Sequence, residues 1–301
     1  MKVLLTGGAG FIGSHLAEKL LDEGHRVAVV DNLSVGQPEW VPEDAEFHQG
    51  DIRDSKFVEE VFESFDPDVL NHHAAHNDAM GSLEDPVEDA SSNVIGSLKL
   101  LEAARENGVE KVIYASSGGL SYGEPQEVPT GEDHAMRPSY PYGISKHSFE
   151  HYLELYQQMY DLDFVVLRYA SVYGPRPTGG VIKNFMEAAA NGEKPVVFGD
   201  GSQTRDFIHV EDIVNANVRA LERGSGFYNI GTCEETSVNE LWQKIAAITG
   251  VKEDPEHRDR WPGDIDRCRL DYSKAEEELG WKPQVELGEG LEKLWSRHYQ
   301  D

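Results

Sequence analysis

The chain has little cysteine, no long apolar run and little positive charge. Its two cysteines, Cys233 and Cys268, lie far apart without a CxxC pair, so neither a disulfide framework nor a cysteine-based zinc site is indicated. No apolar run approaches the roughly 20 residues that a membrane-spanning helix needs, and the opening MKVLLTGG shows no signal-peptide pattern. These absences predict a protein of the reducing cytoplasm that has no membrane partner.

Positive charge is scarce: 27 Lys and Arg residues accompany 55 Asp and Glu residues, which gives a formal net charge of −28 at pH 7. Such a surface repels the phosphates of nucleic acid, so the composition disfavours a nucleic-acid partner. Our hypothesis for the acidity is a salt-rich cytoplasm, because dissolved ions screen the repulsion among like charges that would otherwise weaken the fold.

Short β-rich segments alternate with helical periodicity through the first half of the chain. This alternation predicts an α/β fold with a doubly wound, Rossmann-type parallel sheet. We expect strands at 2–7, 26–31, 45–51, 68–75, 111–117 and 164–170, and helices at 14–24, 94–108, 181–192, 238–250 and 273–280.

The pattern loosens from about residue 171, and 301 residues exceed the usual size of one domain. We therefore expect an NAD-binding Rossmann domain over 1–170, to which a segment at about 206–231 returns. A smaller, discontinuous α/β substrate-binding domain is expected over 171–205 and 232–301.

A glycine-rich turn, TGGAGFIGSHL, joins the first strand to a helix. Gly7 suits the tight turn, Gly10 the close approach of a pyrophosphate, and Gly13 the packing of helix on strand. Asp31, at the end of the second strand, can accept hydrogen bonds from both ribose hydroxyls. Its charge and the absence of arginine in DNLSVG favour NAD over NADP.

Three histidines stand where the fourth strand ends, in HHAAH, namely His72, His73 and His76. No acidic or cysteine residue stands at a usual ligand spacing from them, so we predict no metal site. The small residues Ala74 and Ala75 let the backbone lie against a ligand at the carboxyl edge of the sheet.

Tyr142 and Lys146 stand four residues apart in YPYGISK, where a helix is expected to begin. A lysine ammonium one helical turn away can lower the pKa of a phenol, and the positive nicotinamide of NAD⁺ can lower it further, so that the phenolate becomes a base for alcohol oxidation. Gly143 indicates close packing, and we expect a ring against it. Ser117, with Ser116 in reserve, would hydrogen-bond the reacting oxygen.

The chain resembles the extended short-chain dehydrogenase/reductase family, and within it the nucleotide-sugar epimerases. The resemblance runs through TGGAGFIGSHL, DNLSVG, GDIRD, HHAAH, DPVEDASSNVIGSLKLLEAARENGVEKVIYASSGG, YPYGISK, LRYASVYGPR, GDGSQTRDFIHVEDI, PGD and DYSKAEEELGWKP, in the family's order and over nearly the full length. It implies an NAD-dependent 4-epimerase acting on UDP-glucose or UDP-galactose through a transient 4-keto sugar.

The resemblance also implies roles for individual residues. Tyr142, Lys146 and Ser117 would be catalytic, and Arg205 and Arg260 would clamp the diphosphate of the nucleotide sugar. The other implied positions are, for the cofactor, Gly7, Gly10, Phe11, Ile12, Gly13, Asp31, Asn32, Asp51, Ile52, Ala74, Ala75, Asn93 and Ser116, and, for the substrate, Ser171, Val181, Val197 and Phe198.

Two positions depart from the family pattern. Ser171 stands where many relatives have asparagine, which leaves the sugar open, and Gly118 and Gly119 follow the serines, which leaves Ser116 as the reserve for Ser117 as the catalytic hydroxyl. The alternatives are a UDP-glucuronate 4-epimerase or decarboxylase, a 4,6-dehydratase, which would need an Asp-Glu pair near Gly118, and a non-catalytic NAD-sensing protein.

Family members commonly form homodimers through the helix at about 93–107 and the helix that starts at Tyr142. We expect the same here, with the apolar residues Leu98, Leu101, Phe149 and Tyr152 as candidates for the interface.

The charge hypothesis makes a testable prediction. The melting temperature should rise with KCl concentration, because screening removes repulsion within a chain of net charge −28. Differential scanning fluorimetry across a KCl series measures it, and a melting temperature indifferent to salt would contradict the hypothesis.

Overall fold

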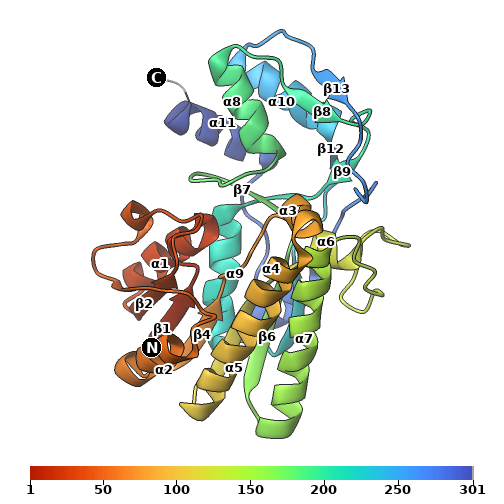
Figure 1. Ribbon diagram of the computed structural model, residues 1–301. Helices are drawn as coiled ribbons and strands as arrows, with labels where there is room; N and C mark the ends of the chain where they lie inside the picture. The colour runs from red at the N-terminus through yellow and green to blue at the C-terminus, as the bar shows by residue number, and fades with distance from the viewer. Residues whose placement is uncertain (300–301) are drawn as a thin grey trace.

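A seven-stranded parallel sheet forms the centre of the larger of two lobes (Figure 1). The computed structural model describes residues 1–299. The strand order, β11-β6-β5-β4-β1-β2-β3, confirms the predicted doubly wound α/β fold. The strands are β1 (Lys2–Thr6), β2 (Arg26–Asp31), β3 (Glu46–Gln49), β4 (Val69–His72), β5 (Lys111–Ser117), β6 (Asp163–Tyr169) and β11 (Gly226–Ile230).

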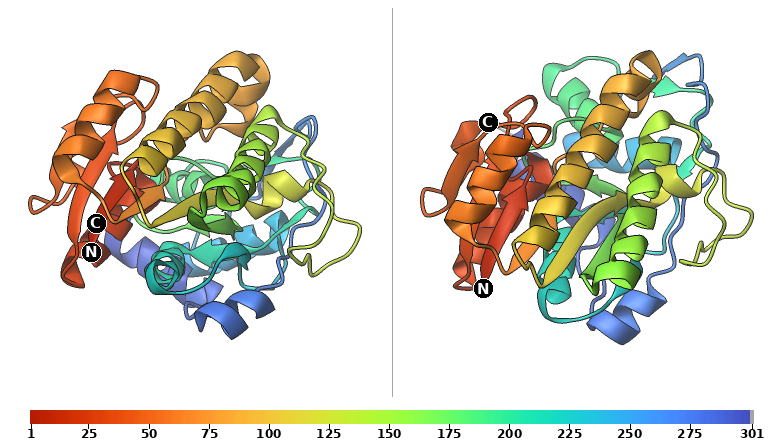
Figure 2. Two further views of the ribbon diagram at one scale, coloured as in Figure 1. Left: turned by 90° about the horizontal axis from the view of Figure 1, so that it is seen from below. Right: turned by 60° about the horizontal axis from the view of Figure 1, so that its bottom comes forward.

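Helices cover both faces of this sheet (Figure 2). On one face lie α2 (Ser55–Phe65), α5 (Ser97–Glu106) and α7 (Pro141–Tyr160), and their apolar sides enclose a buried cluster with the sheet. On the other face lie α1 (Phe11–Asp22) and α9 (Val210–Glu222), which bury a second cluster. Burial of apolar surface on both faces is what a parallel sheet requires.

Two of the candidate interface residues face this core instead of the surface. Leu101 is 0% exposed and Phe149 1% exposed, and both belong to the cluster between the sheet and its covering helices. Leu98 is partly buried against the same cluster, whereas Tyr152 is exposed. The prediction was wrong for Leu101 and Phe149, because apolar periodicity marks a buried face without saying what buries it.

The smaller lobe lies beyond the carboxyl ends of the sheet strands (Figure 1). Its core combines Phe185, Trp242, Ile245 and Leu291. Its helices are α8 (Val181–Asn191), α10 (Val238–Thr249) and α11 (Leu287–His298), and the short strands around it are β7 (Ser171–Tyr173), β8 (Val196–Phe198), β9 (Thr204–Arg205), β10 (Phe207–His209), β12 (Thr236–Ser237) and β13 (Glu256–Arg258).

Short elements fill the connections. Those at the carboxyl edge of the sheet follow β4 and β5 and carry several of the residues discussed below. They are α3 (Ala79–Glu84), α4 (Pro86–Ala90), the π-helical segment η2 (Ser91–Gly96) that leads into α5, and α6 (Gly118–Tyr122), while η1 (Pro38–Trp40) and η3 (Ala275–Leu279) lie elsewhere.

The chain returns to the main sheet late in the sequence. Strand β11 pairs in parallel with β6 at the sheet edge. The segment 275–281, which the predicted division places in the smaller lobe, also packs on the larger one: Ala275, Leu279 and Trp281 are buried in the cluster of α1 and α9. Trp281 Nε1 donates to the Asp212 carbonyl at 2.9 Å. Within residues 1–299, no helix combines the length and apolar character needed to cross a bilayer.

Candidate active site

The glycine-rich turn brings the start of α1 against the end of β1. Gly7 has φ +72°, and a Cβ there would lie 2.7 Å from the Ala74 nitrogen. A Cβ at Gly13 would lie 2.2 Å from the Gly7 carbonyl oxygen. These contacts explain two of the glycines: Gly7 makes the turn and Gly13 admits the helix. The first turn of α1, beginning with Phe11 and Ile12, therefore presents its free N–H groups at the carboxyl edge of the sheet.

Asp31 ends β2 beside this turn, as the sequence predicts. Its carboxylate accepts hydrogen bonds from the Ala9 amide at 3.0 Å and the Leu33 amide at 2.8 Å. Burial raises the pKa of Asp31. The two amides hold the carboxylate in one orientation and leave lone pairs on both oxygens for further donors.

The next residues along this edge form a small polar cluster. Asn32 Nδ2 donates to Asp51 at 3.2 Å, and a hydrogen bond from Arg53 lowers the pKa of Asp51 to about 2. Ile52 is buried against Gly96. Together with Asp31 and the glycine turn, these residues fit the ribose, base and diphosphate of an adenine dinucleotide, and the glycine turn and Asp31 fit NAD rather than NADP.

The three histidines after β4 do not converge. His72 hydrogen-bonds Thr6 Oγ1 at 2.7 Å and Ser97 Oγ at 2.8 Å, whereas His73 hydrogen-bonds Asn217 Oδ1 at 3.2 Å. Burial lowers the pKa of both, to about 4 for His73. These two side chains are neutral members of the core, and they anchor the strand that leads to Ala74 and Ala75.

Tyr142 lies at the start of α7, where its backbone N–H donates to Ser82 Oγ at 3.2 Å. A Cβ at Gly143 would lie 2.4 Å from the Leu120 carbonyl oxygen, so Gly143 admits the backbone of α6 and not an aromatic ring. Lys146, one turn further, is 2% exposed, and its Nζ lies 4.2 Å from the centre of the Tyr114 ring.

The electrostatic environment of this pair differs from the expectation. Burial lowers the pKa of Lys146 to about 7, while the carboxylates Glu150 and Asp89 raise it. Burial and then Asp89 raise the pKa of Tyr142. Within the chain, removal from water outweighs any help that the lysine gives the phenolate. The chain's own groups therefore favour the protonated phenol, and the predicted lowering requires an added positive charge.

The two candidate serines have different surroundings. Ser116 is buried and donates to Glu150 Oε1 at 2.6 Å, and Glu150 in turn pairs with Arg168 at 2.9 Å. Ser117 is partly exposed, and its Oγ accepts from the Leu120 amide at 3.3 Å as the N-cap of α6. Because the hydroxyl proton of Ser117 goes to no residue within 1–299, Ser117 is the serine that can donate to a substrate.

Several predicted substrate residues come together between the lobes. Ser171, Val181 and Arg205 line one cavity of about 260 Å³. Phe198 packs against Trp261 with ring centres 4.5 Å apart. The side chain of Val197 is only 1% exposed and lies in the core of the smaller lobe, so it is not free to contact a base from the side.

The two candidate clamp arginines meet at a shared aspartate. Arg205 forms an ion pair with Asp264 and donates to the Ile265 carbonyl at 3.0 Å. Arg260 pairs with Asp266 at 2.5 Å and donates to the Asp264 carbonyl at 3.1 Å. The structure thus brings both guanidinium groups to one place, where carboxylates of the chain already occupy them.

Asn93 is buried behind the site. Its Nδ2 donates to Asp89, Ser145 and the His76 carbonyl, and its Oδ1 accepts from the His76 amide at 2.8 Å. With its amide engaged in this way, Asn93 fixes the loop after β4, and any contact with a cofactor would be secondary.

The sequence-based prediction gave four polar residues around Tyr142 and Lys146 no role at this site. They are His76, Asp89, Glu150 and Arg168. Only Glu150 had a usable signal, since Tyr142, Lys146 and Glu150 follow at four-residue intervals on one helix face. The other three meet the pair through tertiary contacts that local spacing does not report.

The fold and the site are those of a dinucleotide-binding enzyme of the short-chain dehydrogenase/reductase type. Comparison with known sequences makes this specific: the model of the NAD-dependent epimerase/dehydratase family matches residues 3–231. The chain belongs to this family, which confirms the predicted resemblance.

Three similar proteins illustrate the relationship. The UDP-glucose 4-epimerase of Mycolicibacterium smegmatis is 44% identical, with 97% of each chain covered. The structure of UDP-glucose 4-epimerase from Thermotoga maritima with UDP-glucose has a TM-score of 0.97 at 44% identity, covering 98% of each chain. That of the Thermus thermophilus enzyme with NAD has a TM-score of 0.96 at 41% identity, covering 100% of this chain and 99% of the other.

The serine environments yield a paired prediction. Ser117→Ala should lower kcat about 100-fold, because it removes the free donor to the reacting oxygen. Ser116→Ala should change kcat less than about tenfold but lower stability by about 1 kcal/mol, because Glu150 loses a buried donor. Steady-state assays and thermal melts measure both effects, and the reverse ranking in kcat would make Ser116 the catalytic serine.

Proposed function

We propose that the protein is an NAD-dependent nucleotide-sugar 4-epimerase of the UDP-glucose type, an isomerase that works through a transient 4-keto sugar. The observation that carries the proposal is the position of half-buried Tyr142 and buried Lys146, one helical turn apart at the start of α7, beside the short helices that follow β4 and β5. The relatives and structures named above support it, since they are UDP-glucose 4-epimerases.

Tyr142 is the proposed base. Its phenolate would take the proton from the sugar C4 hydroxyl, and the resulting phenol would return it when the opposite configuration forms, while Ser117 hydrogen-bonds the same sugar oxygen. Bound NAD supplies the hydride acceptor and, through its positive nicotinamide, the charge that the phenolate needs. Lys146 contributes its ammonium one helical turn from Tyr142.

The remaining residues of the proposed site would bind NAD and the nucleotide sugar. Asp31 and the first turn of α1 would bind the adenosine and diphosphate of NAD. Arg205 and Arg260 would hold the diphosphate of the nucleotide sugar by exchanging their aspartate partners for phosphate oxygens. If the 4-keto sugar turns about this fixed diphosphate, hydride returns to the other face and C4 inverts.

The rival activities differ in what they require. A 4,6-dehydratase needs an acid and a base after the catalytic hydroxyl, but Gly118 and Gly119, which have no side chains, stand at those positions. A UDP-glucuronate 4-epimerase or decarboxylase stays the second candidate, because Ser171, lining the cavity, shortens a hydrogen-bonding arm toward the sugar. An NAD-sensing protein would not need the intact Tyr142, Lys146 and Ser117.

The proposed setting is the cytoplasm. Cys233 and Cys268 are both free thiols, which fits a reducing compartment. The excess of negative charge argues against nucleic acid as a partner.

The proposed assembly is a homodimer. Exposed apolar side chains gather on α4, η2 and the outer side of α7, including Val87 at 76%, Ile95 at 50%, Ile144 at 53% and Met159 at 65% exposed. An apolar surface of this kind favours a partner, and a second copy of the same chain is the simplest one, because a twofold axis pairs the surface with itself.

The dimer can be tested by mutation. The double variant Leu155→Asp, Met159→Asp should convert a dimer to a monomer. Both side chains are exposed in the single chain, and in the dimer each new carboxylate would be buried opposite the same carboxylates of the second copy. Analytical ultracentrifugation measures the mass, with Leu155→Met as the apolar control. A wild-type protein that sediments as a monomer at micromolar concentration would refute the dimer.

The central test of function uses a panel of UDP- and dTDP-sugars with chromatographic separation of the products. We expect interconversion of UDP-glucose and UDP-galactose by the wild type and at least a 1000-fold loss in kcat for Tyr142→Phe, with NAD binding largely kept. Conversion of UDP-glucuronate alone would move the proposal to the second candidate, and full activity of Tyr142→Phe would remove the proposed base.

A further inference from the structure

A buried carboxylate stands beside the proposed catalytic pair. Asp89, on α4, is 1% exposed. It accepts a hydrogen bond from Asn93 Nδ2 at 2.9 Å, and its Oδ1 lies 3.7 Å from Nδ1 of His76. That Nδ1 atom is itself buried and hydrogen-bonds no residue within the described 1–299. Within residues 1–299, Asn93 is therefore the side chain that hydrogen-bonds this buried carboxylate.

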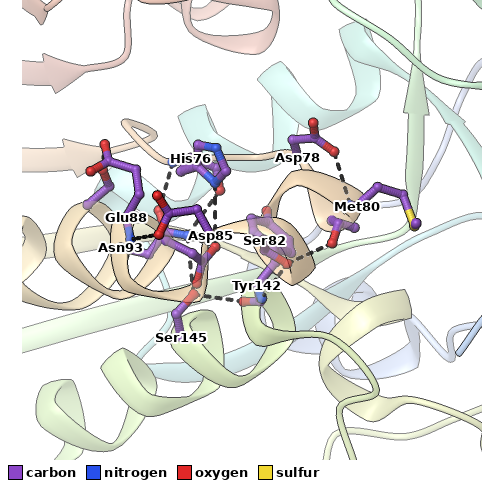
Figure 3. A network of polar contacts seen from close by, with 12 residues as sticks. His76, Asp78, Met80, Ser82, Asp85, Glu88, Asn93, Tyr142 and Ser145 are labelled. Carbon is purple, nitrogen blue, oxygen red and sulfur yellow. Dashed lines mark hydrogen bonds and ion pairs between the residues drawn. The ribbon is translucent and has the colours of Figure 1, made fainter. Parts of the chain in front are cut away.

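Asn93 ties this carboxylate to α7, the helix that carries Tyr142 and Lys146. The same amide accepts from the His76 N–H, donates to the His76 carbonyl and donates to Ser145 Oγ at 3.2 Å (Figure 3). Ser145 Oγ in turn donates to the Tyr142 carbonyl at 2.9 Å. The loop after β4, η2 and α7 are thus joined by one side chain, which fixes the position of Asp89 relative to Tyr142 and Lys146.

Two carboxylates raise the pKa of Lys146: Glu150, one turn along the same helix, and Asp89 of α4, which Asn93 links to Ser145, the residue before Lys146. Glu150 also serves Arg168 at 2.9 Å, Ser116 at 2.6 Å and His147 at 3.1 Å. By contrast, Asp89 pairs with no arginine or lysine head group at ion-pair distance within 1–299, so its negative charge is left to act on its neighbours.

Further titratable groups facing this region come from β5 and from the end of β4. Tyr114 of β5 lies against Lys146, and His72 and His73 at the end of β4 have their pKa lowered by burial and by the charge of Lys146. These groups are neutral, so Asp89 is the one carboxylate in this set whose field reaches both Tyr142 and Lys146 without a guanidinium beside it.

We propose that Asp89 is a positioning residue of the epimerase, a buried carboxylate that keeps Lys146 in its ammonium form while Tyr142 exchanges protons with the sugar. This inference rests on the proposed function. Asn93 holds the carboxylate in place by a hydrogen bond, and the His76 ring lies next to it, with Nδ1 3.7 Å from Asp89 Oδ1.

The same charge acts on the two catalytic groups in one direction. Asp89 raises the pKa of Lys146 and also raises that of Tyr142. Without it, Tyr142 would ionise at lower pH and Lys146 would lose its proton at lower pH. Since activity needs the phenolate and the ammonium together, the whole active pH range should move toward acid.

The test is Asp89→Asn in the NAD-loaded enzyme, because asparagine keeps an oxygen for Asn93 and removes only the charge. Both limbs of the pH profile of kcat/KM should move to lower pH by about one unit. The titration of Lys146, followed by NMR of ¹³Cε-labelled lysine and assigned with Lys146→Arg, should move in the same direction. Glu84→Gln, which removes an exposed charge at the end of α3, should leave both unchanged.

A folded Asp89→Asn enzyme with an unmoved Lys146 titration, or one that loses the same fraction of kcat/KM at every pH, would overturn the proposal. If Asp89→Asn fails to fold, Asp89→Ser makes the same comparison with a smaller neutral residue. A wild type that converts no UDP-sugar would instead refute the proposed function, and the Lys146 titration would still test the carboxylate.

Discussion

The chemistry of this molecule depends on the removal of Tyr142 and Lys146 from water. Burial alone disfavours both charged forms: it brings the pKa of Lys146 to about 7 and raises that of Tyr142. The chain by itself therefore holds a protonated phenol next to an ammonium that is easily lost. In the proposed reaction, the base comes into being only when a positive nicotinamide is bound, which restricts proton transfer to the loaded enzyme.

Such a pair needs rigid surroundings, and buried polar groups supply them. Glu150 and Arg168 form an ion pair in which the side chains are 1% and 5% exposed. Pairs of this kind add little net stability because desolvation offsets their attraction, but they fix orientation. Arg168 also donates to Tyr122 at 2.9 Å. Strand β6 and helices α6 and α7 are thereby held in register beside the catalytic residues.

Local sequence signals predicted the parts of the molecule that local chemistry determines. The six strands predicted in the first half, the glycine turn and Asp31 at the end of β2 are all found in the structure, because turns and strand ends depend on neighbouring residues. Local signals do not show which surface covers an apolar helix face. Periodicity placed Leu101 and Phe149 on such a face, but it did not identify the sheet as the surface that covers them.

The candidate site shows the same division. Tyr142, Lys146 and Ser117 could be found from spacing on one helix and from a strand end, whereas Asp89 reads in the sequence as one more acidic residue of a charged chain. Its position beside Lys146 results from the packing of α4 on α7. The family resemblance also implied that Val197 binds the substrate, but β8 turns that side chain into the smaller lobe's core.

The aspartate that Arg205 and Arg260 share has a further consequence. Since Asp264 already satisfies these guanidinium groups, a diphosphate has to displace an internal anion rather than fill a bare cationic hollow. Any free anion would have to compete with these carboxylates for the same two arginines. Chloride in a concentrated salt solution would therefore find both guanidinium groups already paired.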